Sequence, residues 1–236
     1  MSSVAFHDLM KERIFMTPPA PPSRLPFFGK TFINALYSGL FIGIAGTVFL
    51  ATPNKIAGAV FFAFALLSII CYGFKLFTGA VGYLAVQEKK EFFPYLLSLV
   101  IIWLGNLGGC FFTGCMIRAS RVFPLLEKRV SSLCADKMAD SFTSLLILAF
   151  FCGILMYVGV ETFRKEKLPG FVRGIMVFLC VIVFILSGFE HSIAGMYYFA
   201  AAGEWNLAAL KAVGIMTLGN ALGGMLIPFG DKFRQY

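Results

Sequence analysis

Ionisable side chains interrupt two otherwise apolar runs of the sequence. Glu190 and His191 lie inside the run Gly174–Ala202, and Lys75 lies inside the run Ile56–Val86. An imidazole in such a place donates a proton to a weak-acid anion, donates a hydrogen bond while neutral, or has a structural role with an Asn or Thr partner. For Glu190 and Lys75 two alternatives arise: each holds a broken backbone in place, or the two pair with one another.

A short apolar piece follows each interruption, which predicts that a helix begins there. Thr78 and Ser192 are expected to be the N-caps of these two helices. The free N–H groups at a helix N-terminus carry partial positive charge, so two such ends that face one point form a site for a small anion. The rest of the path is expected to be apolar, and the candidates from helical spacing are Phe62, Leu66 and Phe184.

The composition indicates a membrane protein. Of the 236 residues 59% are hydrophobic and 14% are charged, and the mean hydropathy is +0.84. Soluble chains average about 45–50% apolar and about 25% charged residues, so lipid is the expected solvent here. The formal net charge of +8 would suggest nucleic acid on a soluble protein. Because the basic residues collect between apolar runs, we expect no nucleic-acid partner.

Six membrane spans are predicted. A helix that crosses about 30 Å of hydrocarbon needs about 20 apolar residues. The stretches that meet this length without an internal charge are Phe32–Thr52, Phe92–Ile117, Ser141–Val160 and Ala212–Gly230. The two interrupted runs count as the second and fifth spans. The expected fold is therefore all-α, with an N-terminal cytoplasmic segment over residues 1–30 and a channel domain over 31–236, whose repeats are 31–117 and 138–230.

The distribution of positive charge predicts cytoplasmic termini. Of the 20 Lys and Arg residues, twelve fall in segments that an N-in arrangement places inside, seven fall outside, and Lys75 lies in the interrupted second span. An even number of spans returns the C-terminus to the inner side. The expected location is therefore the cytoplasmic (inner) membrane, although the connection Arg118–Asp140 is unusually basic for an outer loop.

The two halves of the chain repeat one another. The interrupted span is second in each half, and the span after it contains Gly-Asn-x-x-Gly, at residues 105–109 and 219–223. Three spans per half is an odd number, so the halves are expected to have opposite topology. Close helix packing explains the glycines. The amides of Asn106 and Asn220 either brace the broken backbones or line the pore.

These motifs resemble the formate/nitrite transporter family. The matching runs are Leu76-Phe77-Thr78-Gly79, Gly188-Phe189-Glu190-His191-Ser192-Ile193-Ala194 and the two Gly-Asn-x-x-Gly motifs. The similarity extends from about Thr31 to Phe229. It implies an aquaporin-like protomer of six spans with broken second and fifth helices, a homopentamer with one pore in each protomer, and transport of a small monovalent anion.

The resemblance also implies roles for single residues. Thr78 and His191 match the central polar pair of the family's pore, and Leu66 and Phe184 match the hydrophobic constrictions on either side of it. The further matches are Leu76 and Phe77 in a loop that gates the inner side, Lys137 at the outer vestibule, and Asn106 and Asn220 near the breaks. Lys75 departs from the family, which usually has Asp or Glu at this position.

The expected function is passive or proton-coupled transport of a weak-acid anion of the formate or nitrite class. Hydrosulfide and other small monocarboxylates are alternative substrates. A neutral-solute channel is less favoured, because an aquaporin would carry Asn-Pro-Ala at both breaks, where this sequence has other residues. Catalysis, a metal and a cofactor are not expected, because a zinc site needs about three protein ligands and His191 is the sole histidine of the spans. Membrane lipid and further copies of the chain are the expected partners.

Overall fold

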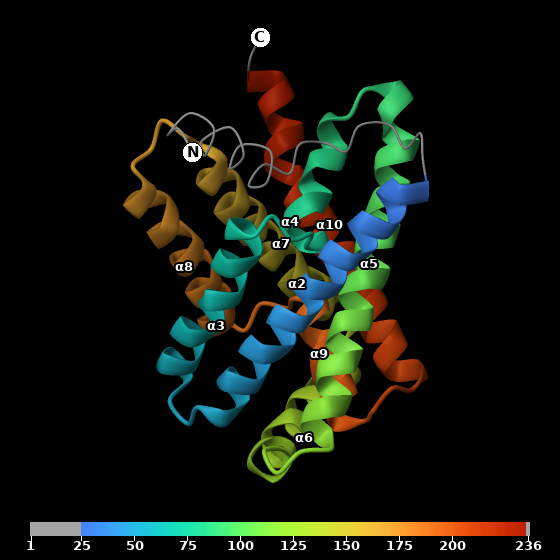
Figure 1. The fold of residues 1–236 in the computed structure, drawn as a ribbon, viewed down its shortest axis with the longest axis vertical. Coiled ribbons are helices and arrows are strands. Elements are labelled where there is room, and N and C mark those ends of the chain that lie inside the picture. The colour runs from blue at the N-terminus through green and yellow to red at the C-terminus, as the bar shows by residue number, and fades with distance from the viewer. Residues whose placement is uncertain (1–24, 235–236) are drawn as a thin grey trace.

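The computed structural model describes residues 25–234, and every regular element within that range is a helix (Figure 1). The elements are α2 (Leu25–Ala51), α3 (Lys55–Cys71), α4 (Phe77–Ala80), the 3-10 helix η1 (Val81–Val86), α5 (Lys89–Arg118), α6 (Phe123–Ala139), α7 (Phe142–Arg164), α8 (Gly170–Leu186), α9 (Ser192–Ala202) and α10 (Leu207–Arg234). Most of the predicted N-terminal segment, residues 1–24, lies outside the described residues, and α2 already includes residues 25–30.

Four of these helices, α2, α5, α7 and α10, are long and apolar enough to cross a membrane. They contain the four uninterrupted apolar stretches of the sequence. By contrast, α3 and α8 have 17 residues each, fewer than the roughly 20 that a single crossing needs. The short helices α4 and α9 follow them in the chain, each after a non-helical segment.

A glycine turn ends both α3 and α8. Gly73 and Gly188 have left-handed φ angles of 69° and 72°, which an L side chain adopts only with strain. The next N–H groups, of Phe74 and Phe189, donate to the carbonyls of Ile69 and Phe184 at 2.9 Å. This is the Schellman arrangement, which satisfies the last helical carbonyls and turns the chain out of the helix.

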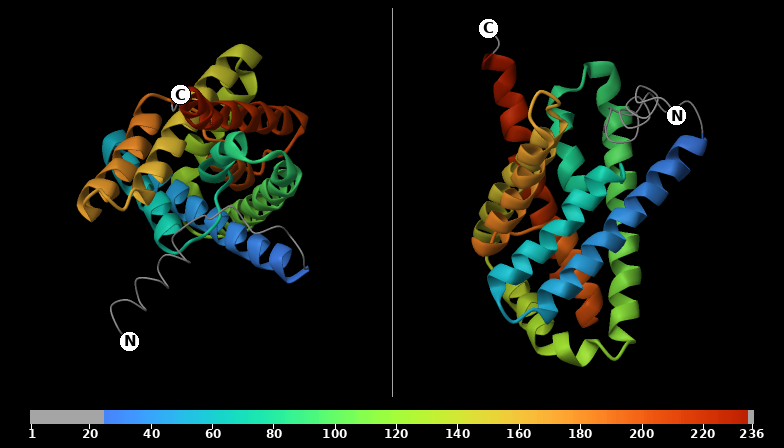
Figure 2. Two further views of the ribbon diagram at one scale, coloured as in Figure 1. Left: turned by 90° about the horizontal axis from the view of Figure 1, so that it is seen from above. Right: turned by 60° about the vertical axis from the view of Figure 1, so that its left-hand side comes forward.

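Small residues bring the long helices together in two pairs, α2 with α5 and α7 with α10 (Figures 1 and 2). A Cβ added at Gly109 would lie 2.1 Å from the Leu36 carbonyl oxygen, and one at Gly223 would lie 1.9 Å from that of Phe150. At these crossings the two backbones are therefore in direct contact. This confirms close packing as the role of the Gly-Asn-x-x-Gly glycines.

The helix α6 lies across one end of the molecule, where the sequence indicated only a basic connection (Figure 1). We call this end the α6 face. The opposite end, where α2 begins and α10 ends, is called the terminal face (Figure 2).

Three of the basic residues at the α6 face bind to the C-terminal ends of helices. Arg129 donates to the carbonyls of Phe49, Leu50 and Thr52 at the end of α2. Arg118 donates to the last carbonyl of α9, and Lys55 donates to the last carbonyl of α8. Because cations stabilise the negative ends of helices, these residues bind the protein's own backbone. Two of the basic residues in the predicted outer connection, Arg118 and Arg129, are therefore bound to backbone carbonyls.

Candidate functional site

Two buried amides hold the non-helical segments in place. The Asn106 side-chain oxygen accepts from the Phe77 N–H at 2.9 Å, and its amide nitrogen donates to the carbonyls of Lys75 and Ala35 at 2.8 Å. Asn106 itself is fully buried. All the hydrogen atoms of this amide and one of its lone pairs are therefore engaged with backbone.

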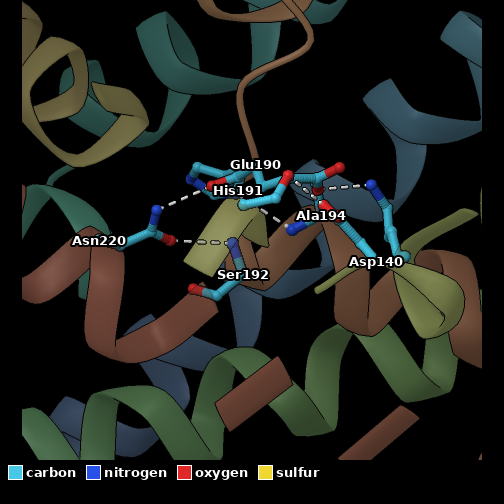
Figure 3. A network of polar contacts seen from close by, with 8 residues as sticks. Asp140, Glu190, His191, Ser192, Ala194 and Asn220 are labelled. Atoms are coloured by element: carbon cyan, nitrogen blue, oxygen red, sulfur yellow. Dashed lines mark hydrogen bonds and ion pairs between the residues drawn. The ribbon is translucent and has the colours of Figure 1, made fainter. Parts of the chain in front are cut away.

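Asn220 makes the equivalent contacts in the second half of the chain. Its oxygen accepts from the Ser192 N–H at 2.9 Å, and its nitrogen donates to the carbonyls of Glu190 and Ala149 at 2.8 Å. Figure 3 shows this amide joining the backbone on both sides of His191. These contacts correspond to the first of the two alternatives for the asparagines, in which they brace the broken backbone.

The predicted N-caps are wrong by one or two residues. The N-cap of α4 is Leu76 and that of α9 is His191, whereas Thr78 and Ser192 already lie within the helices. His191 caps α9 through its ring, because Nδ1 accepts from the Ala194 N–H at 3.1 Å. The sequence preference for Ser or Thr at N-caps missed this role, since an imidazole lone pair can replace the hydroxyl oxygen.

The ring of His191 joins the two halves of the molecule. Its Nε2 atom lies 2.9 Å from the Thr78 hydroxyl oxygen, and both side chains are buried. Because the Ala194 N–H can only donate, Nδ1 must present a lone pair. The neutral ring therefore carries its proton on Nε2 and donates to Thr78. Among the described residues His191 is the only hydrogen-bond partner of the Thr78 hydroxyl, so its hydrogen can donate to a ligand.

An aromatic chain continues from this pair. The Phe184 ring is stacked on His191 with centroids 5.7 Å apart, and Phe62 meets Phe184 edge-on at 6.1 Å. Leu66, one turn beyond Phe62, is 2% exposed and faces Gly159 of α7. Phe184 thus lies directly against the polar pair with Phe62 next to it, and all three predicted apolar side chains are buried.

Leu76 and Phe77 lie at the start of α4. They are 1% and 7% exposed, and the Phe77 N–H is the group that Asn106 holds. The short α4 passes directly into η1. Both residues are therefore adjacent to Thr78, on the chain that leads toward the terminal face.

Glu190 forms an ion pair with Lys137, with Nζ and Oε2 2.5 Å apart. The predicted alternative of a pair between Glu190 and Lys75 is therefore wrong: the C-terminal end of α6 supplies the partner. The side chains are 8% and 15% exposed, so water screens the pair only weakly. The nearby Cys134 adds no negative charge, because burial raises the pKa of its thiol to about 12.

This ion pair is testable by a double-mutant cycle. Lys137→Met and Glu190→Gln are each expected to lower the apparent melting temperature in detergent, because each leaves one charge without its partner. The double variant should recover part of the loss, with a coupling of about 1 kcal/mol. Lys128→Met with Glu127→Gln is the control, since both side chains are exposed on α6. Purely additive effects at Lys137 and Glu190 would contradict the pairing.

Comparisons with known proteins agree on one family. A family model described as "Formate/nitrite transporter" matches residues 24–230. The "Nitrite transporter NirC" of Escherichia coli (strain K12) is 25% identical, over 86% of this chain and 87% of the relative.

Two solved structures share the fold. A "Pentameric formate channel with formate bound" superposes with a TM-score of 0.76 at 21% identity, over 89% of this chain and 97% of that chain. An "FNT family ion channel" superposes with a TM-score of 0.75 at 23% identity, over the whole of both chains.

Proposed function

The chain belongs to the formate/nitrite transporter family, and we propose that it carries a small monovalent weak-acid anion of the formate or nitrite class through a pore in each protomer. Its relatives are transporters and channels, so the protein is a membrane protein of anion transport and not an enzyme. The observation that carries the proposal is the Thr78–His191 hydrogen bond at 2.9 Å, buried where the two braced segments meet.

The proposed architecture is six membrane spans in two inverted repeats. It counts α3 with α4 and η1 as one broken span, and α8 with α9 as another. The matched contacts of Asn106 and Asn220 support this, because each fixes the start of a half-helix in the same way. Broken helices of this kind are stable in lipid only beside a cavity or within protein.

The proposed assembly is a homopentamer in the cytoplasmic membrane, with both termini inside. The pentameric channel that shares the fold supports the assembly. The capping roles of Arg118, Arg129 and Lys55 support the orientation, since these cations of the α6 face are bound to backbone carbonyls. The remaining charge bias then favours an inner terminal face.

In the proposed mechanism a neutral His191 orients Thr78. The Nε2–H donates to the Thr78 oxygen, and the Thr78 O–H then donates to the anion. The N-terminal end of α9 adds the partial positive charge of the helix dipole. A lasting imidazolium is disfavoured, because a proton on Nδ1 would face the Ala194 N–H, which now donates to that atom. The proton that neutralises a weak acid therefore comes from solvent through this network.

Flux in proteoliposomes tests the function and its alternatives together. Formate, nitrite, hydrosulfide and a neutral solute such as glycerol are compared at two pH values. We expect the weak-acid anions to enter, and to enter faster at the lower pH, because the neutral acid crosses an apolar layer more readily than the anion. Glycerol flux without anion flux would overturn the proposal in favour of a neutral-solute channel.

The substitution His191→Asn distinguishes the N-cap role of this residue from its hydrogen bond to Thr78. Asparagine is itself a good N-cap, so we expect α9 to persist and the apparent melting temperature to stay close to that of the wild type. The Nε2–H is lost, and anion flux should fall about tenfold, which corresponds to about 1.4 kcal/mol. Thr78→Val, which removes the hydroxyl at equal volume, should give a similar loss. Unchanged flux and pH dependence in both variants would refute the role of the pair.

A further inference from the structure

An apolar groove of about 710 Å³ lies on the outside of the molecule, formed by α5, the start of α10 and the connection that precedes α10. Its walls include Leu104, Gly108, Phe111, Cys115, Leu210 and the ring of Trp205. Ligand pockets in proteins measure about 300–1,000 Å³ and are lined mainly by apolar side chains. None of the lining residues belongs to the proposed anion path, so the groove is a separate site.

The groove has the depth of one membrane leaflet. Its residues on α5 run from Leu104 to Cys115, which is about 17 Å at the helical rise per residue. The hydrocarbon core of a bilayer is about 30 Å thick, so one leaflet contributes about 15 Å. At the inner end Trp103 joins α5 to α10, because its Nε1–H donates to the Thr217 hydroxyl at 3.1 Å. The groove therefore begins near mid-depth and opens toward the α6 face.

An unsatisfied donor lies at the outer end of the groove. Trp205 is in the connection between α9 and α10, toward the α6 face (Figure 1), and its ring packs on Phe199 with centroids 5.9 Å apart. The Nε1 atom of Trp205 is buried, and no group of the described residues accepts its hydrogen. A buried indole N–H normally has a hydrogen-bond partner. The groove thus calls for a ligand that brings an acceptor to this point.

A cation lies next to this donor. Arg118 is exposed and ends α5 one turn after Cys115. Its Nη1 donates to the Ala202 carbonyl, three residues before Trp205 in the chain, and the guanidinium donates to no other group of residues 28–234. From the α6 face inward the order is therefore a cation, an indole N–H and then apolar side chains.

We propose that the groove binds one acyl chain of a glycerophospholipid, with the Trp205 Nε1–H donating to an ester carbonyl oxygen and Arg118 facing the phosphate. A phospholipid presents these groups in the same order, with the phosphate outermost, the ester next and the hydrocarbon inward. Tryptophan is enriched at headgroup depth for this reason. The other charged residues beside this end in the sequence, Glu204 and Lys211, have opposite signs, so Arg118 supplies the net charge. The inference depends on the membrane location and not on the transported anion.

A second copy of the chain is the alternative occupant. A membrane-spanning helix of another copy has its backbone carbonyls engaged within the helix, so it offers the indole no backbone acceptor. A lipid ester carries a free carbonyl oxygen at the depth where the indole lies. The lipid therefore satisfies both the apolar walls and the donor.

Quenching of tryptophan fluorescence by bromine tests the site. The chain has two tryptophans, so the full chain with Trp103→Phe has Trp205 as its sole reporter. It is reconstituted in vesicles of unbrominated phosphatidylcholine, and an ester-linked phosphatidylcholine with brominated acyl chains is added at increasing mole fraction. The host lipid is either ester-linked or ether-linked. The ether lipid keeps the phosphate and the chains but lacks the ester carbonyl.

We expect half-maximal quenching at an about three- to tenfold lower mole fraction in the ether host than in the ester host, because only the ester lipid accepts from the indole. A diacylglycerol with the same brominated chains lacks the phosphate and should require an about fivefold higher mole fraction than the phospholipid. If Trp103→Phe does not fold, the wild type and Trp205→Phe replace it. The wild type alone should then show the difference between the hosts.

Gly108→Phe fills the groove from its wall. A Cβ at Gly108 meets nothing within 4 Å, so the added ring has room, and the apparent melting temperature should stay within about 2 °C of the parent chain. The difference between the two hosts should vanish in this variant. Gly230→Phe is the matched control, because position 230 on α10 is equally open but lies outside the groove. It should keep the difference.

Three results would overturn the proposal. The first is equal half-maximal quenching in both hosts, which is the behaviour of unselective boundary lipid. The second is a host effect that survives Gly108→Phe. The third is no quenching at any mole fraction, which would show that a second copy of the chain covers the Trp205 ring. A diacylglycerol that quenches as well as the phospholipid would overturn the contact between Arg118 and the phosphate.

Discussion

Asn220→Leu is expected to lower the apparent melting temperature by about 10 °C and to abolish anion flux. Leucine has a similar volume but leaves the Ser192 N–H and the Glu190 and Ala149 carbonyls without their amide partner. An orphaned buried group costs about 1–3 kcal/mol, so the loss is at least about 3 kcal/mol. For a chain of this length 1 kcal/mol corresponds to about 2–4 °C. Fluorescence-detected gel filtration after heating measures the shift.

Asn34→Leu is the control for this substitution. Asn34 lies on α2 and is only partly buried, and its side chain makes no hydrogen bond within the described part of the chain. The same change of residue type there should shift the melting temperature by no more than about 2 °C. Asn106→Leu should reproduce the Asn220→Leu result, because the two amides make matched contacts. If Asn220→Leu preserves both stability and flux, the starts of the half-helices need no bracing.

Gly223→Ala has the second largest expected effect. The added methyl group would lie 1.9 Å from the Phe150 carbonyl oxygen and 3.1 Å from the Ile154 nitrogen. Both are backbone atoms of α7, so the helices must separate at a cost of about 3 kcal/mol. Alanine recovers about 1 kcal/mol of helix propensity. The steric term is larger, and the net loss of about 2 kcal/mol should lower the melting temperature by about 6 °C.

Gly214→Ala tests this balance on the same helix. A Cβ at Gly214 meets nothing within 4 Å, so only the propensity gain applies, and the variant should be as stable as the wild type or slightly more so. Thermal unfolding of both variants in one detergent gives the comparison. Equal melting temperatures for the two variants would mean that α7 and α10 do not approach as closely as described.

Most of the architecture could be predicted from the sequence, because hydropathy and helical spacing are local properties. Apolar runs of the right length predicted the four helices that are long enough to cross a membrane, and the glycines of the repeated Gly-Asn-x-x-Gly motif predicted close helix packing. The exact ends of the helices were harder to predict from the sequence. The α9 N-cap is His191 and not Ser192, because the preference for a hydroxyl cap does not include an imidazole that is also held by Thr78 from the other half.

The sequence by itself determined the solvent of this protein, its four long apolar helices and its family, since residue type and spacing are enough for each. Only the tertiary structure decided the partners: Lys137 and not Lys75 for Glu190, backbone groups for Asn106 and Asn220, and helix ends for Arg118 and Arg129. The physical reason is the short range of these interactions. An ion pair or hydrogen bond acts over a few ångströms, and residues 53 or 71 positions apart reach that distance only after the helices have packed.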